Sequence, residues 1–323
     1  MKRVFGKSGI EVSSIGLGCW AIGGPFYSGD TPLGWGEVDD AESTRAIMAA
    51  IDSGVTFFDT ADAYGTGHSE RVLGKAVTGR RSSVVIATKF GNLFNEDTKQ
   101  KSGGSAEPDY VRSACEASLK RLGTDYIDLY QLHLNDYDMT DALATRDALE
   151  GLVAAGKIRA YGWSTDSAER ARLFGDGKSC TATQFEMNVL NDAPELVDVC
   201  EDMNLAAILR GPLAMGLLTG KYVPGRAVGD KDVRSNNFDW MRYFKDGKPN
   251  PEWASKLEAV REILTAGGRS LAQGAIAWLW ARSSRCVPIP GIRTEKQAAE
   301  NFSVLQQQPL TSEQMTQIES LIR

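Results

Sequence analysis

The chain has 323 residues, of which 42% are hydrophobic and 24% are charged, and its net charge is −6 at pH 7. This length fits one α/β barrel with a large core, and we expect one domain over residues 1–323. The negative charge argues against a nucleic-acid partner, because such proteins carry a basic patch or stripe. The five cysteines are scattered and only two histidines are present, so we expect neither a disulfide framework nor a metal site.

The ends of the chain give no sign of export or membrane insertion. The basic start, MKRVFGKSGIEVSS, lacks the apolar stretch of a signal peptide. The most apolar late segment, LAQGAIAWLWA, is too short to cross a bilayer. We therefore expect a cytoplasmic protein with no membrane partner, in a reducing compartment that scattered cysteines also favour.

Short apolar runs alternate with longer amphipathic segments along the chain. The opening residues predict a β-hairpin that turns between Gly6 and Gly9. Eight apolar runs have the length of buried strands, at residues 14–18, 55–60, 83–90, 126–133, 158–164, 181–188, 205–211 and 286–290. Helical patterns lie between most of them, for example over residues 40–54, 107–123 and 140–156, each of which ends on a glycine. This alternation predicts βαβ units that close into an α/β fold, a (β/α)8 TIM barrel with the N-terminal hairpin as a cap.

Three long segments, residues 23–39, 90–108 and 222–253, follow the first, third and seventh predicted strands. The loops that follow barrel strands carry active sites, and long loops inside a compact domain are usually functional. The aromatic residues of these segments either line a substrate cleft or only pack the loops against the barrel; they include Phe26, Trp35, Phe94, Trp240 and Phe244.

One motif near the first long segment is misleading. GLGCWA at residues 16–21 matches the dinucleotide-binding pattern G-x-G-x-x-A. That pattern needs a helix to open at its third position, whereas the glycines and prolines of the following IGGPFYSGDTPLGWG forbid one. We therefore do not expect a Rossmann fold.

Polar residues interrupt three successive apolar strands at their carboxyl ends. Asp59 ends TFFD, Lys89 ends VVIATK and His133 ends LYQLH, while Tyr64 follows Asp59 by a short loop. A buried lysine needs a partner, and Asp59 on the next strand is the natural one. A lysine ammonium near Tyr64 favours the phenolate and makes the phenol a better acid. One interpretation is a structural ion pair at the barrel rim. We predict instead that the four residues form one unit, which protonates a developing alkoxide while a cofactor supplies hydride.

With these residues in place, the chain resembles the aldo-keto reductase superfamily over essentially its whole length. FFDTADAYGTGHSERVLGKA is similar to the first signature of that family, and IDLYQLH is similar to the segment that supplies its active-site histidine. GWST, QFEMN, GPLAMGLLTGKY and PIPGIRTEKQAAEN follow in the family's order. The resemblance implies a catalytic tetrad of Asp59, Tyr64, Lys89 and His133, with Tyr64 as the general acid and base.

The resemblance also implies a nicotinamide dinucleotide at the barrel mouth. Ser164 and Gln184 would bind its carboxamide, and Thr165 stands where the family often has asparagine. Arg210 stands where many members have an aromatic residue. We expect its guanidinium to contact the cofactor, by stacking on the nicotinamide or reaching a phosphate, rather than only to form a salt bridge at the rim. The other residues expected at the cofactor are Trp20, Gly211, Pro212, Leu213, Gly216, Leu217, Lys221, Gly291, Arg293, Thr294, Gln297 and Asn301.

The segment after strand eight bears on the choice of cofactor. A helix N-terminus at this place is a usual phosphate site in barrels, and Arg293 offers bidentate donors to the adenosine 2′-phosphate. Some family members carry arginine where this chain has Gln297. The resemblance favours NADP(H) over NAD(H). Trp20, Trp35 and Phe90 are expected either to shape an apolar wall of the substrate site or to pack in the core and rim.

The predicted function is hydride transfer between the cofactor and a small aldehyde, ketone or matching alcohol. A barrel glycosidase would need two carboxylic acids, of which Glu186 could be one, but no acid pair is evident. Some relatives of the resembled family are cofactor-binding accessory subunits of ion channels. Steady turnover with an aldehyde separates a reductase from such a subunit.

Overall fold

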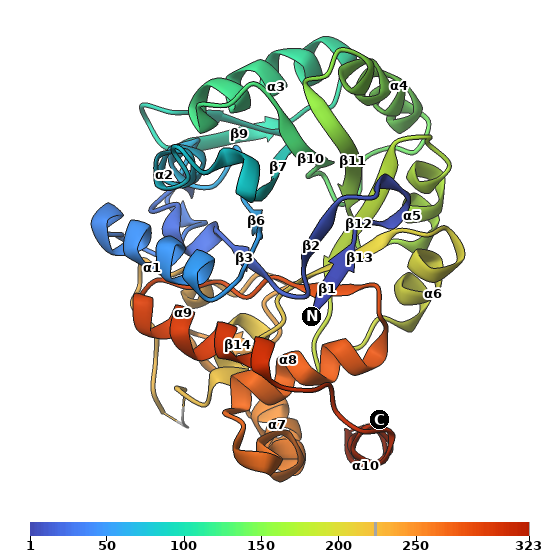
Figure 1. Cartoon of the computed structure of the whole chain (residues 1–323). Helices are drawn as coiled ribbons and strands as arrows, with labels where there is room; N and C mark the ends of the chain where they lie inside the picture. The colour runs from blue at the N-terminus through green and yellow to red at the C-terminus, as the bar shows by residue number, and fades with distance from the viewer. Residues whose placement is uncertain (223–224, 323) are drawn as a thin grey trace.

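Eight parallel strands form the centre of the fold. The structure is a computed structural model that describes residues 1–222 and 225–322. In their order around the sheet the strands are β3 (Gly16–Gly18), β6 (Phe57–Asp59), β7 (Val85–Phe90), β10 (Ile127–Leu132), β11 (Ile158–Ser164), β12 (Cys180–Glu186), β13 (Ala206–Arg210) and β16 (Cys286–Pro288). A parallel bridge between Gly18 and Gly291 connects the last strand segment to the first. The strands form the predicted TIM barrel, nearly closed and seen end-on in Figure 1.

Helices surround the barrel on all sides (Figure 1). After the first six barrel strands come, in turn, α1 (Asp40–Asp52), α2 (His68–Ala76), α3 (Pro108–Leu122), α4 (Asp141–Ala154), α5 (Ala168–Gly175) and α6 (Pro194–Asp202). The last two strands are followed by α7 (Pro251–Thr265), α8 (Leu271–Arg282), α9 (Glu295–Phe302) and α10 (Ser312–Ile322). Their ends follow the sequence signals: Asp39 caps α1 by accepting two backbone N–H groups, and Gly123 ends α3 with a left-handed φ of 64°.

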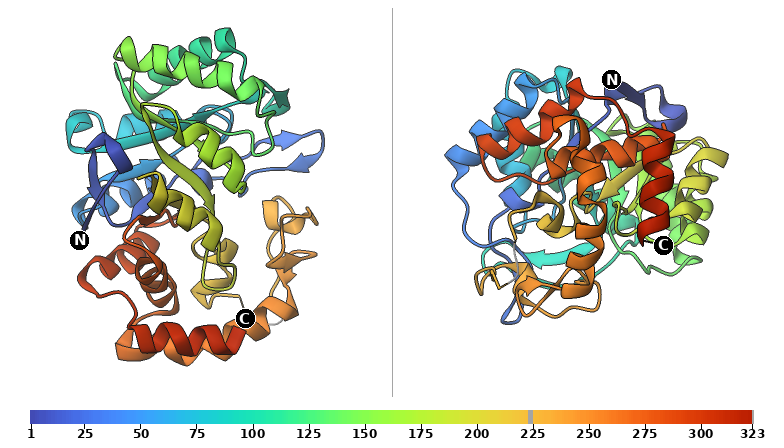
Figure 2. Two further views of the ribbon diagram at one scale, coloured as in Figure 1. Left: turned by 90° about the vertical axis from the view of Figure 1, so that its right-hand side faces the viewer. Right: turned by 90° about the horizontal axis from the view of Figure 1, so that it is seen from below.

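An N-terminal hairpin lies across one end of the barrel. Its strands, β1 (Lys2–Val4) and β2 (Glu11–Ser13), are antiparallel, and the short 3₁₀ helix η1 (Gly6–Ser8) lies between them. Phe5, Ile10 and Val12 form one apolar cluster with inward-facing barrel residues such as Phe57 and Ala87. Burial of these side chains holds the hairpin at the end of the barrel opposite the carboxyl ends of the strands (Figure 2, left panel).

The long segments gather at the other end, as the left panel of Figure 2 shows. The first contributes β4 (Tyr27–Ser28) and β5 (Thr31–Pro32), and the second contributes β8 (Asn92–Asn95) and β9 (Gln100–Gly104). These four strands form one small sheet in the order β5-β4-β9-β8. The sequence predicted only loops here, because strands such as QKSGG are short, polar and glycine-containing.

The third long segment also contains local structure. It holds η5 (Val233–Ser235), β14 (Phe244–Lys245) and β15 (Lys248–Pro249), and its residues 223 and 224 lie outside the described residues. The remaining 3₁₀ helices of the described chain are η2 (Trp20–Ile22), η3 (Arg81–Ser83), η4 (Ala214–Thr219), η6 (Ala266–Gly268) and η7 (Ser303–Gln306).

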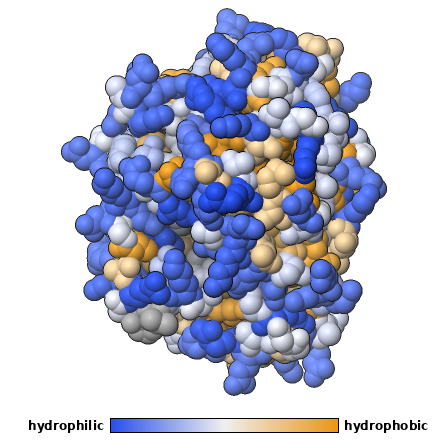
Figure 3. All heavy atoms as spheres, turned by 60° about the vertical axis from the view of Figure 1, so that its left-hand side comes forward, coloured by the Kyte–Doolittle hydropathy of each residue, from blue (hydrophilic) through white to orange (hydrophobic). Residues whose placement is uncertain are grey.

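The outer surface is mostly polar on the face drawn in Figure 3, with hydrophobic residues gathered in scattered patches. In the part of the chain that the structure describes, no helix combines the length and the hydropathy needed to cross a membrane.

One buried arginine, Arg234, joins the third long segment to the first. Arg234 binds Asp232 through two nitrogens, at 2.9 and 2.6 Å, and donates to the carbonyl oxygen of Met215 at 3.0 Å. Its guanidinium also lies over three aromatic rings, at 4.6 Å from Trp35, 4.8 Å from Tyr222 and 5.3 Å from Phe244. The third segment is thereby fixed to the first segment and to the loop after β13.

Candidate active site

The four residues predicted from the strand ends meet at the carboxyl end of the barrel. Lys89 is fully buried, and its Nζ lies 2.5 Å from Asp59 Oδ1, 2.7 Å from the carbonyl oxygen of Thr60 and 3.3 Å from the Tyr64 hydroxyl. The ring of His133 stands edge-on to that of Tyr64, with 5.8 Å between the ring centroids. The neighbouring strands β6, β7 and β10 therefore bring together a carboxylate, an ammonium, a phenol and an imidazole.

A tight turn places the Tyr64 side chain. Gly65, Thr66 and Gly67 all have positive φ, at 59°, 54° and 88°. A Cβ atom on Gly65 would collide with the carbonyl oxygen of Gly23, so glycine is required where this turn passes the first loop. The sequence AYGTG thus turns the chain directly after Tyr64 and keeps the phenol beside Lys89.

The Asp59 carboxylate is bound by three side chains. Oδ1 faces Lys89, while Oδ2 accepts hydrogen bonds from Gln184 Nε2 at 2.8 Å and from Gln131 Nε2 at 3.1 Å. Asp59, Gln131 and Gln184 are each at most 1% exposed. A buried carboxylate is tolerated only when it is paired and hydrogen-bonded, and these three contacts meet that requirement. The sequence analysis did not select Gln131, although it stands two residues before His133.

Burial and charge act in opposite directions on the two central groups. Burial lowers the pKa of Lys89, but Asp59 and Tyr64 raise it, and the resulting pKa is above the ordinary value. Burial raises the pKa of the Tyr64 phenol and Lys89 lowers it, with a net increase. Lys89 therefore lowers the pKa of Tyr64, as the sequence predicted, but the increase caused by burial is larger. Lys89 is charged and Tyr64 protonated at neutral pH.

His133 is, like Tyr64, neutral at neutral pH. Burial lowers the pKa of its imidazole well below the ordinary range, and the positive charges of Lys89, Arg210 and Lys101 lower it further. Its Nδ1 atom is buried and has no hydrogen-bond partner among the described residues. A neutral imidazole carries one N–H donor, which can bind a substrate oxygen beside Tyr64.

Aromatic rings continue outward from Tyr64. Trp20 stacks on Tyr64, with centroids 5.9 Å apart, and contacts Trp35 and Trp240 at 5.4 and 6.4 Å. Trp20 and Trp35 thus lie together beside the tetrad. The structure does not bring Phe90 there: it is fully buried and packs on Tyr130 at 4.6 Å. Side chains alternate along a strand, so Lys89 points into the barrel while Phe90 points toward the helices.

The end of β11 offers one free hydroxyl. Ser164 is almost buried, at 6% exposure, and its side chain makes no hydrogen bond to a described residue. The hydroxyl of Thr165 instead donates to the carbonyl oxygen of Asn135 at 2.9 Å and accepts from the backbone N–H of Ser167. Thr165 is therefore engaged in the loop after β11, whereas Ser164 is available to a ligand.

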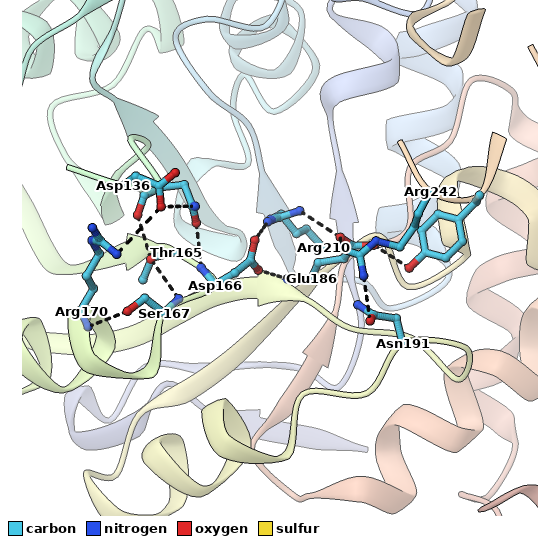
Figure 4. Close-up of polar contacts among 11 residues, drawn as sticks. Asp136, Thr165, Asp166, Ser167, Arg170, Glu186, Asn191, Arg210 and Arg242 are labelled. Carbon is cyan, nitrogen blue, oxygen red and sulfur yellow. Dashed lines mark hydrogen bonds and ion pairs between the residues drawn. The ribbon is translucent and has the colours of Figure 1, made fainter. Parts of the chain in front are cut away.

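Arg210 forms salt bridges at the rim, the role that was considered but expected less than a contact with the cofactor. Figure 4 shows its guanidinium between Asp166 and Glu186, with Arg242 on the far side of Glu186. Arg210 bonds Asp166 directly and lies 3.9 Å from Glu186. Its charge nevertheless lowers the pKa of both Tyr64 and His133, so it lies close to the tetrad.

The loop after β13 has an unusual backbone. Ala214, Met215 and Gly216 have φ values of 47°, 54° and 97° in succession. The turn is closed by its own hydrogen bonds, because the N–H groups of Ala214 and Gly216 donate to the carbonyl oxygens of Gly211 and Leu213 at 2.9 and 2.8 Å. The other residues predicted here are the buried Pro212, Leu213 and Leu217, Gly211 with a φ of 63°, and the exposed Lys221.

The segments that follow the first and the last barrel strands meet at the start of α9. Thr294 caps this helix by accepting the N–H of Gln297, whose side-chain oxygen accepts the N–H of Arg293. The guanidinium of Arg293 donates to the carbonyl oxygens of Trp35 and Glu37 in the first long segment. Of the other two residues expected here, Gly291 is exposed and Asn301 is buried.

The groups left unpaired at the mouth fit a nicotinamide dinucleotide. Ser164 Oγ and Gln184 Oε1 accept no hydrogen bond from a described residue, and the two residues are register partners at the ends of β11 and β12. Serine and glutamine are suited to the donor and acceptor pair of a carboxamide. A helix N-terminus such as that of α9 is suited to a phosphate.

The fold and the site together define an α/β-barrel oxidoreductase. A family model described as "Aldo/keto reductase family" matches residues 14–323, and the chain belongs to this family. As a member it is an NAD(P)H-dependent enzyme that acts on carbonyl groups, as the sequence resemblance predicted.

Similar proteins cover nearly all of the chain. Aldo-keto reductase YhdN of Bacillus subtilis (strain 168) is 32% identical over 98% of this chain and 91% of its own length. Aldo-keto reductase yakc [NADP(+)] of Schizosaccharomyces pombe is 33% identical over 91% of this chain and 84% of its own. Among solved structures, the glycerol dehydrogenase AKR11B4 from Gluconobacter oxydans superposes with a TM-score of 0.81 at 28% identity, covering 97% of this chain and 92% of that one.

Proposed function

We propose that the protein reduces an aldehyde or ketone to the alcohol with NADPH, and that Tyr64 is the proton donor. The observation that carries this proposal is the contact of Lys89 with both Asp59 Oδ1 and the Tyr64 hydroxyl, at 2.5 and 3.3 Å. A phenol beside a buried, permanently charged ammonium can release its proton because the phenolate is stabilised at once. Asp59 keeps the ammonium charged and in place.

The residues divide the reaction between them. A reduced nicotinamide, its carboxamide held by Ser164 and Gln184, would supply the hydride to the carbonyl carbon. Tyr64 gives its proton to the carbonyl oxygen as negative charge develops there, and Lys89 stabilises the phenolate that remains. The neutral His133 donates a hydrogen bond to the same oxygen and fixes its position. In the reverse direction the phenolate accepts the alcohol proton.

The preference for NADP(H) rests on Arg293 and on one relative. The guanidinium of Arg293 lies at the start of α9, where it binds carbonyl oxygens of the first long segment. A 2′-phosphate is a stronger acceptor than a neutral carbonyl and would compete for these donors. The S. pombe relative carries NADP(+) in its printed name.

The test is oxidation of NADPH, and separately of NADH, followed by absorbance with a panel of aldehydes and ketones. Tyr64→Phe is the matched variant, because it removes only the hydroxyl. We expect turnover by the wild type, faster with NADPH, and a loss of about a hundredfold or more in Tyr64→Phe, since a positioned general acid contributes that much. Cofactor affinity, measured by fluorescence, should stay within about twofold of the wild type.

Two results would contradict the proposal in different ways. Retained activity in Tyr64→Phe would remove Tyr64 from the role of proton donor. Tight cofactor binding by a wild type that turns over none of the panel would favour the accessory-subunit function considered from the sequence.

A further inference from the structure

The polar layer beneath the tetrad contains an amide that the reaction scheme leaves without a role. We propose that Gln131 is a positioning residue that holds the Asp59 carboxylate so that Lys89 remains in contact with the Tyr64 hydroxyl. This inference rests on the proposed function of Tyr64 and Lys89.

Gln131 lies in the interior of the barrel next to the lysine. It is fully buried on β10 and is the register partner of Lys89 on β7. Its Nε2 donates to Asp59 Oδ2 at 3.1 Å, and its Oε1 is buried without a partner among the described residues. A buried amide that satisfies only one end costs stability, so the bond to a charged oxygen is the contact that accounts for a glutamine here.

Gln131 and Gln184 share the same oxygen of Asp59 but differ in what else they can do. Gln184 stands at the end of β12, and its free Oε1 makes it a candidate for the cofactor carboxamide. Any movement of Gln184 toward a cofactor leaves Gln131 as the remaining amide on Oδ2. Gln131 is therefore the donor that keeps Asp59 oriented throughout the reaction cycle.

The orientation of Asp59 matters because Lys89 divides its protons among three acceptors. The contact with the Tyr64 hydroxyl, at 3.3 Å, is the longest of the three, and the one with Asp59, at 2.5 Å, is the shortest. Without Gln131, Oδ2 loses a donor, and the carboxylate turns to share both oxygens with Lys89. The ammonium is then drawn away from Tyr64, which weakens its stabilisation of the phenolate.

Of the groups around the phenol, Arg210 and His133 make no hydrogen bond to Gln131, whose amide binds Asp59. Lys89, Asp59 and Arg210 act electrostatically on Tyr64, and His133 faces it from β10. On the β3 side Asp59 faces Cys19, whose thiol is neutral because burial and Asp59 raise its pKa, against the smaller effect of Lys89. A substitution of Gln131 alone therefore tests the chain of contacts from Asp59 through Lys89 to Tyr64.

The first test compares Gln131→Met with the wild type, because methionine keeps the length and removes the amide. We expect kcat of carbonyl reduction to fall about tenfold, the value for losing one hydrogen bond to a charged group, with NADPH affinity within about twofold. The rising limb of the pH profile for alcohol oxidation should move to higher pH. Thr181→Val is the control, since its hydroxyl is also buried without a partner among the described residues, on the barrel strand β12. It should leave both readouts unchanged.

A second variant covers the case in which Gln131→Met does not fold. In Gln131→Glu the new carboxyl can donate to Asp59 only when it is protonated, so its kcat relative to the wild type should fall as the pH rises. An unshifted pH profile in Gln131→Met, whatever its kcat, or a ratio for Gln131→Glu that is flat with pH, would overturn the proposal.

The phenol itself gives a readout that does not need turnover. Tyrosinate absorbance is titrated in the wild type and in Gln131→Met, each against its own Tyr64→Phe derivative. The Tyr64 signal should titrate at higher pH in Gln131→Met, and coincident curves would overturn the positioning role. A failure of the proposed function is a separate result, because the wild type itself would then show no turnover.

Discussion

Removal of the lysine charge tests the buried ion pair directly. In Lys89→Met the fully buried Asp59 loses the ammonium at 2.5 Å and keeps only the amide donors Gln131 and Gln184. Breaking a buried pair costs about 3–5 kcal/mol, because the remaining charge is left uncompensated. The two amides still stabilise the carboxylate, because each hydrogen bond to a charged group contributes about 1.5–3 kcal/mol. We therefore expect the free energy of unfolding to fall by about 3 kcal/mol, the lower end of the range for breaking a buried pair.

The measurement is urea unfolding of the wild type, Lys89→Met and the double variant Asp59→Asn/Lys89→Met. Loss of both charges should restore most of the free energy of unfolding, because a neutral buried pair carries no uncompensated charge. The dependence on urea should keep the same slope in all three proteins. A loss below about 1 kcal/mol in Lys89→Met, the range of solvent-exposed pairs, would refute the description of this pair as buried.

Two further predictions concern pH and the cofactor. The native pKa of His133 is depressed, so the unfolded chain binds a proton that the native protein does not; stability is full above the ordinary pKa of about 6.5 and falls as the pH drops below it. When the pH is lowered from about 7 to about 5, the melting temperature of His133→Gln should fall less than that of the wild type. An equal fall in both proteins would show that His133 is not held neutral. Arg293→Ala should weaken NADPH binding about tenfold or more, with NADH binding nearly unchanged. Equal losses in fluorescence titrations with the two cofactors would mean that Arg293 does not contact the 2′-phosphate.

The barrel and the tetrad could be predicted because both leave strong local signals. Buried parallel strands read as apolar runs, and glycines mark the ends of the helices between them. A charged residue such as Lys89 at the end of such a run is rare without a partner, and strand order made Asp59 that partner. The contact of Lys89 with Asp59 and Tyr64 agrees with that prediction.

Other features depend on which way a side chain points. Phe90 was expected near the substrate, but the alternation of side chains sends it outward when Lys89 points inward. The same alternation could have found Gln131, which faces inward two residues before His133. The salt bridges of Arg210 and the small sheet of β4, β5, β8 and β9 had no such signal, because their partners come from segments far apart in the sequence.

The linkage of the long segments bears on how this barrel could acquire a new specificity. The first segment pairs with the second through β4 and β9, and it contacts the third through Trp35 under Arg234 and through a hydrogen bond from Val233 N–H to the Gly34 carbonyl. Replacing the first segment breaks its contacts with both of the others, and replacing the second or the third breaks its contacts with the first. Loop grafting in the laboratory, or recombination in evolution, must therefore exchange the three segments together as one module on an unchanged barrel.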